Sequence, residues 1–197
     1  MLTDIKLKEF PNTPSGDSGR IHPHKFAMWV AIASIIMMFA GLTSAFIVKS
    51  NLAGWAEVQT PQVFLFSTVF LFLSSITMQM SLRAFKQRSM QHYRLLIGGT
   101  LLLGVVFVVL QWIGFSWLWQ HGVRLKGAGA GQFFYIIAGL HALHVIGGMV
   151  ALTVLCFKAF FGKTKSYNSV PVEVISIYWH FVDILWLYLF IFFIWIG

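Results

Sequence analysis

The sequence contains few charged residues and very few acidic ones. Of its 197 residues, 10% are charged, with 6 acidic against 14 basic side chains, whereas 58% are hydrophobic. Soluble domains carry about 25% charged residues, so this chain has too few to cover a surface that faces water. We therefore expect an integral membrane protein without a separate soluble domain.

Cysteine is almost absent. Cys156 is the single cysteine, which excludes an intrachain disulfide and a site built from several thiolates. Its apolar surroundings in the sequence predict a small buried side chain. The sequence also lacks a paired-cysteine copper motif, a P-loop, an HExxH motif and a nucleophile elbow. We accordingly assign no catalytic residue and no metal ligand to this chain.

Five long apolar segments are present, each of about the 20 residues that a helix needs to cross a bilayer. They cover residues 26–48, 62–82, 95–117, 133–157 and 174–196. The predicted fold class is all-α, a polytopic bundle of five transmembrane helices. We expect residues 1–24 to form a flexible arm and residues 25–197 a single transmembrane domain. The Gly-Ala run at 127–131 predicts a mobile loop ahead of the fourth segment.

The basic residues are distributed unevenly between the connections. Of the 14 lysines and arginines, 11 lie in the N-terminal arm and the connections 83–94 and 158–173. The other three are Lys49, Arg124 and Lys126. This bias predicts a cytoplasmic N-terminus and a periplasmic C-terminus. It also accounts for the net charge of +8 through anionic lipid head groups, without nucleic acid as a partner.

Asp183 is the acidic residue that lies deep inside a predicted segment. A charged Asp at that depth costs about 2.5–3.5 kcal/mol on insertion scales, and His180 precedes it by three residues on the same helical face. One interpretation is a proton relay or a polar contact with a neighbouring subunit. The other, which we favour, is an internally satisfied polar pair that fixes helix packing.

The fourth segment carries His141 and His144. Metal or haem ligation is one hypothesis, and its sharpest form places one haem between His144 and His180. A haem held by two histidines in a membrane bundle needs them on facing helices, and few histidines lie within the segments. We favour hydrogen bonds between helices for these side chains, and for Gln111 in the third segment.

Small residues recur at four-residue spacing in the fourth segment, as Ala138 with Ala142 and Gly147 with Ala151. Small side chains allow helix backbones to approach closely in a membrane. The pattern predicts that the fourth helix lies inside the bundle.

Two motifs near the C-terminus resemble a known family. They are Gly-Leu-His-Ala-Leu-His-Val-Ile-Gly-Gly at 139–148, which follows Phe-Phe-Tyr at 133–135, and Tyr-Trp-His-Phe-Val-Asp-Ile-Leu-Trp at 178–186. They resemble the last two helices of haem–copper oxidase subunit III. Met28-Trp29, Ser-Ser-Ile-Thr at 74–77 and Gln111 are similar as well, so the resemblance runs from about residue 22 to 197, in the bacterial five-helix form.

This resemblance implies a non-redox core subunit of a terminal oxidase, such as cytochrome c oxidase, in a bacterial inner membrane. In that family subunit I holds the haems and one copper, and subunit II holds the electron-entry site. Subunit III packs against subunit I, holds phospholipids, stabilises subunit I and supports proton uptake or oxygen access. The implied partners are therefore subunits I and II and membrane lipids.

Other functions remain open from the sequence. Within the same superfamily they are subunit III of a quinol oxidase and a homologue associated with nitric oxide reductase. From other classes they are a haem-b membrane anchor of a dehydrogenase and a small transporter. The absence of internal repeats and of proline-interrupted helices disfavours the transporter.

One departure from the family pattern lies in the first segment. Members commonly carry a Glu after an Ala-Ser or similar pair, but here Ile35 follows Ala33-Ser34. Any role that the family assigns to that carboxylate is therefore not transferred to this chain.

Overall fold

The structure is a computed structural model, and it describes residues 23–50, 62–121, 129–161 and 169–196. The described part contains five α-helices, each long and apolar enough to cross a membrane. They are α1 (Pro23–Ser50), α2 (Val63–Lys86), α3 (Met90–Gln120), α4 (Gly129–Phe161) and α5 (Val170–Ile196). The predicted all-α bundle of five transmembrane helices is thereby confirmed. The division into an arm at 1–24 and a domain at 25–197 stays a prediction.

Several helices continue beyond the apolar segments that predicted them. The expected connection 83–94 shrinks to a turn at 87–89, because α2 and α3 extend into it. Arg88 takes a left-handed conformation in this turn, with φ 58°, as residues after a helix end often do. The expected loop at 127–131 is wrong for its last three residues, which begin α4. Glycine has a low helix propensity, but its cost per residue is small enough for packing to override it.

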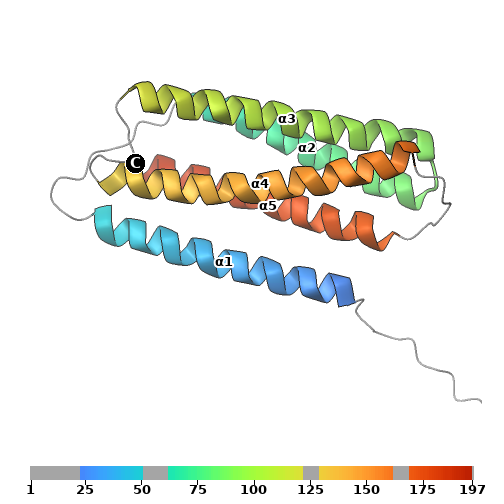
Figure 1. The fold of residues 1–197 in the computed structure, drawn as a ribbon, viewed down its shortest axis with the longest axis horizontal. Helices are drawn as coiled ribbons and strands as arrows, with labels where there is room; N and C mark the ends of the chain where they lie inside the picture. Colours follow the sequence, from blue (N-terminus) through green and yellow to red (C-terminus); the bar gives the residue numbers. More distant parts are fainter. Residues whose placement is uncertain (1–22, 51–61, 122–128, 162–168, 197) are drawn as a thin grey trace, which may run out of the picture.

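α5 occupies the centre of the arrangement. It packs against α1, α2 and α4, and α4 also packs against α1 and α3. α2 and α3 form an antiparallel hairpin, and in the described residues α1 packs against neither of them. Figure 1 shows α1 along one side of the bundle, next to α4 and α5, with α2 and α3 on the other side. Among the five helices α5 is the most buried.

The ends of the bundle differ in what they contain. Figure 1 places the beginnings of α1 and α5, the α2–α3 turn and the end of α4 at one end, and the C-terminus at the other. We call the first the charged end, because it contains Lys25, Lys86 and Glu173. We call the second the aromatic end, because rings such as Phe46 and Phe134 form its core.

The exterior of the bundle is apolar. Large side chains with most of their surface exposed include Leu95, Trp112, Phe161 and Trp195. A soluble protein rarely exposes such side chains in continuous patches, whereas lipid accommodates them. The surface therefore fits a bilayer and helices of neighbouring proteins.

Candidate functional site: polar joints around the last helix

The C-terminal motif contributes two indole N–H groups that join α5 to α2. Trp179 is almost completely buried, and its Nε1 donates to Ser74 Oγ at 3.1 Å. Further along α5, Trp186 Nε1 donates to Thr68 Oγ1 at 3.1 Å. In a membrane a hydrogen bond between helices contributes on average about 0.6 kcal/mol. These two bonds set the rotation and register of α5 against α2.

His180 also joins α5 to α2. Its Nε2 lies 3.3 Å from Gln79 Oε1, and its Nδ1 lies 2.6 Å from Ser75 Oγ. An amide oxygen only accepts, so Nε2–H is the donor to Gln79. A neutral imidazole then accepts through Nδ1, and the Ser75 hydroxyl donates to it. His180 thus bridges Ser75 and Gln79, which are both on α2.

Asp183 is buried, but it does not pair with His180 as we had favoured. Neither of its carboxylate oxygens has a hydrogen-bond partner among the described residues. Ser75 of α2 lies close to both side chains, beside the Asp183 carboxyl group and 2.6 Å from His180 Nδ1. His180 therefore bonds to α2 and not to Asp183.

The two histidines of α4 have different surroundings. His141 is almost completely buried and stacks on Trp186, with ring centroids 5.2 Å apart, and neither ring nitrogen has a partner in the described part of the chain. His144 bonds through Nδ1 to Leu140 O at 2.7 Å, within its own helix. The His144 ring meets Phe39 of α1 edge-on, with centroids 5.9 Å apart. Tyr178 OH donates to the backbone oxygen of His144 at 3.0 Å, which joins α5 to α4.

These positions bear on the metal and haem hypotheses. The His144 ring faces α1, and the His180 ring is bonded on α2. The two imidazoles therefore do not point into a common space between facing helices. Within the described ranges, no group of three or more His, Cys, Asp or Glu side chains is placed to hold a metal ion.

Gln111 joins α3 to α2. It is buried, and its Nε2 donates to Ser67 Oγ at 2.8 Å, while its Oε1 has no partner among the described residues. The same pair of helices is also joined by the hydroxyls of Thr77 and Thr100, which lie 3.0 Å apart. Polar side chains thus join α2 to both of its neighbours.

The four small residues of α4 differ in how deeply they are buried. Ala138 is buried, Ala142 and Ala151 are half-buried, and Gly147 is exposed. A Cβ added at Gly147 would come no closer than 3.7 Å to the Tyr178 hydroxyl.

The closest approach to α5 is made by glycines that our sequence analysis missed. A Cβ at Gly148 would lie 3.0 Å from Trp179, and one at Gly104 of α3 would lie 3.2 Å from the same ring and 2.6 Å from Met149 Sδ. Gly148 could have been found from helical periodicity, because it follows His141 and Val145 on the buried face of α4. The two glycines make room for Trp179 between α3 and α4.

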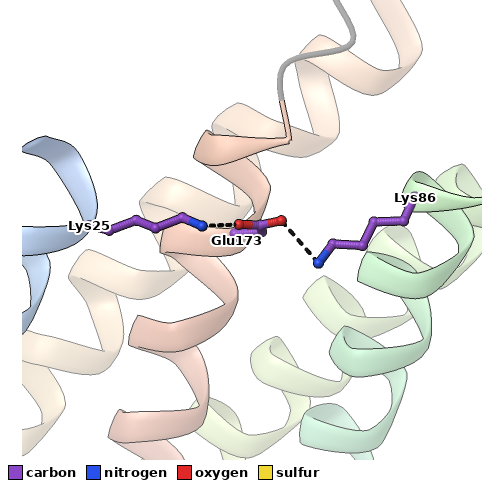
Figure 2. A network of polar contacts seen from close by, with 3 residues as sticks. All are labelled: Lys25, Lys86 and Glu173. Carbon is purple, nitrogen blue, oxygen red and sulfur yellow. Dashed lines mark ion pairs between the residues drawn. The ribbon is translucent and has the colours of Figure 1, made fainter. Parts of the chain in front are cut away.

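An ion-pair network joins three helices at the charged end, and Figure 2 shows its geometry. Glu173 of α5 lies between Lys25 of α1, at 2.5 Å, and Lys86 of α2, at 3.0 Å. The Glu173 side chain is only 16% exposed. The sequence pattern of the lysines predicts topology but not this network. The signal was present, since Glu173 and Asp183 are the only acidic residues in the described ranges.

α1 makes two further contacts of interest with the core. Thr43 and Tyr188 of α5 place their hydroxyls 3.0 Å apart. Ile35, at the position of the family carboxylate, is partly buried and packs against the main apolar core. The interior at this position is therefore filled by an aliphatic side chain.

Taken together, the geometry defines a class: an all-helical membrane protein whose helices are joined by hydrogen bonds between polar side chains. Comparison with known proteins identifies the family. Residues 21–197 match the family model described as cytochrome c oxidase subunit III. The chain belongs to the cytochrome c oxidase subunit III family, which confirms the resemblance seen in the two C-terminal motifs.

Several relatives are similar over most of their length. The chain is 33% identical over 165 residues, 82% of each chain, to a probable cytochrome c oxidase subunit 3 of Mycobacterium leprae. It is 32% identical over 170 residues, again 82% of each chain, to cytochrome c oxidase subunit 3 of Corynebacterium diphtheriae. With cytochrome c oxidase subunit 3 of Bacillus sp. strain PS3 it shares 27% identity over 192 residues, 94% of this chain and 92% of the relative.

Proposed function

We propose that this chain is the non-redox subunit III of a cytochrome c oxidase in a bacterial inner membrane. In this role it packs against subunit I beside subunit II, holds phospholipids and stabilises the catalytic subunit. The observation that carries the proposal is the use of polar side chains in α5. Trp179, His180 and Trp186 form hydrogen bonds with other helices of the same chain, while the exterior is apolar and suited to lipid and partner helices.

The electron donor is proposed from the relatives. Those from Mycobacterium leprae and Corynebacterium diphtheriae are named as subunits of cytochrome c oxidases, which favours cytochrome c over quinol or a nitric oxide reductase partner. The donor site itself belongs to other subunits. Identifying a copper-binding subunit II with paired cysteines in the purified complex would support cytochrome c, and a subunit II without them would favour quinol.

The haem-b anchor is the alternative from another class. It is disfavoured because His144 and His180 face α1 and α2 respectively. Reorienting either ring would break hydrogen bonds that the structure contains. A haemochrome spectrum of the separated subunit distinguishes the two functions, since stoichiometric haem would contradict an oxidase subunit III.

The direct test is affinity purification of the tagged chain from native membranes in a mild detergent. We expect oxidase subunits I and II to co-purify with oxygen-reducing activity. A tagged multi-pass protein of similar abundance serves as the control for non-specific recovery. Isolation of the chain without oxidase subunits would contradict the proposal.

The stabilising role requires a separate measurement. Oxidase isolated from cells that lack this chain should begin turnover at a near-normal rate and then lose activity faster than the complete enzyme. Equal rates of inactivation would show that the chain does not stabilise subunit I.

A role in proton uptake or oxygen access that depends on the family carboxylate is not part of this proposal, because Ile35 occupies its position. Ile35→Glu is expected to create a site that reacts with a hydrophobic carbodiimide, and Ile35→Gln is the matched control without a carboxyl group. Absence of labelling at position 35 in the folded Glu variant would show that α1 is misaligned with the family.

A further inference from the structure

A pocket opens at the charged end of the hairpin that α2 and α3 form. Its volume is about 440 Å³, within the range of about 300–1,000 Å³ that small-ligand sites occupy. Every residue that lines it belongs to α2, α3 or the turn between them. We call it the hairpin pocket. Its polar part is lined by Arg83, Gln87, Ser89 and His92, and its apolar part includes Met80 and Leu96.

The two parts of the hairpin pocket lie at different depths. Met80 is six residues before Lys86 at the end of α2, or about 9 Å at 1.5 Å per residue. On α3, Leu96 and Gly99 follow His92 on one face at helical spacing, and a Cβ added at Gly99 would meet open space. The head-group region adds about 5–8 Å on each side of the hydrocarbon core. The pocket therefore begins among the lipid head groups and opens onto hydrocarbon.

The polar part of the pocket carries a positive charge without a counter-charge. The Arg83 side chain is exposed. In the ranges that the structure describes, the acidic residues are Glu173, which pairs with Lys25 and Lys86, and the buried Asp183. Neither carboxylate forms an ion pair with Arg83. A guanidinium favours phosphate as its partner, because it can donate two parallel N–H bonds to phosphate oxygens.

We propose that the hairpin pocket binds an anionic phospholipid whose head-group alcohol is uncharged, such as phosphatidylglycerol. The Arg83 guanidinium and an N–H of His92 donate to the phosphate, and an acyl chain follows the apolar part of the pocket. Gln87 and Ser89 meet the head-group hydroxyls. The Ser89 hydroxyl already donates to Ala84 O at 3.2 Å, so its oxygen serves them as an acceptor. This inference rests on the proposed lipid-holding function, and it names one site and the class of lipid.

The lining favours this lipid over other sources of phosphate. Phosphatidylethanolamine and phosphatidylcholine carry a cationic head group, and the pocket lining has no carboxylate and no Phe, Tyr or Trp ring to meet it. Free phosphate would leave the apolar part uncovered, whereas a phospholipid covers both parts. Basic pockets between transmembrane helices on the cytoplasmic side are typical sites for anionic head groups, and the Lys and Arg bias predicts that the charged end is cytoplasmic.

The first experiment is photolabelling of the intact oxidase complex in nanodiscs of phosphatidylcholine. A minor fraction of the lipid is phosphatidylglycerol with a diazirine in one acyl chain, and adducts are mapped by mass spectrometry. We expect adducts on peptides that contain Met80 or Leu96, and unlabelled phosphatidylglycerol should suppress them. Equal labelling by a phosphatidylcholine probe with the same diazirine chain would overturn the inference. Equally effective competition by inorganic phosphate would overturn it as well, because it would indicate an anion site that does not select lipid.

The second experiment tests the guanidinium. Arg83→Gln should lower labelling by the phosphatidylglycerol probe about tenfold, as expected for one lost charge-assisted hydrogen bond. Arg94→Gln is the matched control, because it removes the same charge from an exposed position of α3 outside the pocket lining. Thermal unfolding and co-purification with the other subunits verify that both variants are folded. An equal fall in the two variants would indicate non-specific attraction and contradict the site.

The third experiment changes the preference for the head group. Gln87→Glu supplies the carboxylate that the pocket lacks, with little change of shape. The ratio of phosphatidylglycerol to phosphatidylethanolamine labelling should fall about fivefold, as expected for an exposed charge interaction. Gln91→Glu makes the same change at an exposed position outside the pocket lining and should leave the ratio unchanged. An unchanged ratio in the Gln87 variant would contradict the placement of the head group.

These experiments separate the inference from the proposed function. Failure of the original chain to co-purify with oxidase subunits would contradict the proposed function. Normal co-purification, together with no adduct in the hairpin pocket, would contradict only the lipid site.

Discussion

The two ends of the bundle hold α1 against α5 by different means. At the charged end Lys25 reaches Glu173 across 2.5 Å. At the aromatic end Phe46 of α1 packs on Phe192 of α5, with ring centroids 5.3 Å apart and the planes steeply inclined. Phe134 of α4 joins the same cluster through Phe193, with centroids 4.5 Å apart.

The two ends differ in how far water and salt reach the contacts between the helices. Both lysines are partly exposed, at 32% and 54%, so water and salt reach the ion pairs and weaken them. The rings of Phe46 and Phe134 are almost completely buried, and ring packing does not depend on ionic strength. We infer that the aromatic end contributes more to stability, whereas the charged end specifies which helices meet.

The largest expected effect comes from removing a ring at the aromatic end. Phe46→Ala should lower the free energy of unfolding by about 3 kcal/mol, as large-to-small substitutions in packed cores do. Phe157→Ala, which removes a ring that is 61% exposed, is the control. Thermal unfolding of the subunit in detergent measures both. Equal effects would show that the aromatic end is not a packed core.

A smaller effect is expected at the charged end. Glu173→Gln should cost about 1 kcal/mol, because it weakens two partly exposed ion pairs. The salt dependence of unfolding should fall with it, and the same titration with Lys158→Gln, which changes an exposed charge elsewhere, is the control. Unchanged salt dependence in the Glu173 variant would contradict a stabilising network.

A single hydrogen bond near the aromatic end should contribute less. Tyr188→Phe removes the contact with Thr43 at 3.0 Å and should cost about 0.6 kcal/mol, the average for membrane hydrogen bonds between helices. Ser34→Ala is the control, because the Ser34 hydroxyl bonds to Val30 O of its own helix. A double-mutant cycle with Thr43→Val isolates the pair, and additive effects would argue against the bond.

The smallest effect separates the two lysines of the network. Lys25→Met should destabilise more than Lys86→Met, because Lys25 is the closer and the less exposed partner of Glu173. The difference should be about 0.3 kcal/mol, within the range for exposed pairs. Chemical unfolding of the two variants in the same detergent gives the comparison. A larger effect of the Lys86 variant would reverse the ranking of the two contacts.

The fold was predictable because a bilayer imposes a length on each helix and lipid tolerates an apolar exterior. The errors in the predicted helix bounds lie where the chain leaves the hydrocarbon of the bilayer. The connection expected at 83–94 was too long, because α2 and α3 continue past their apolar parts and leave only the turn at 87–89. Residues 129–131 were expected to be loop, but they begin α4. Both regions lie near helix ends, where hydropathy carries little information about where a helix stops.

The candidate site was predictable by residue type and much less by partner. Asp183, His180 and Gln111 were chosen because polar groups are rare in a membrane segment. However, His180 bonds to Ser75 and Gln79 of α2, not to the neighbouring Asp183. The glycine of α4 that packs against Trp179 is Gly148, and not Gly147. One position along a helix rotates a side chain by about 100°, so these assignments needed the helix orientations.

The sequence alone determined that the chain forms five membrane-spanning helices and, through its two C-terminal motifs, the family to which it belongs. A backbone in hydrocarbon must satisfy its own hydrogen bonds within each helix, so the apolar segments can be recognised one at a time. Only the tertiary structure decided which side chains meet, such as Glu173 with Lys25 and Lys86. Those contacts depend on the rotation and register of helices that are distant in the sequence, and no local pattern encodes them.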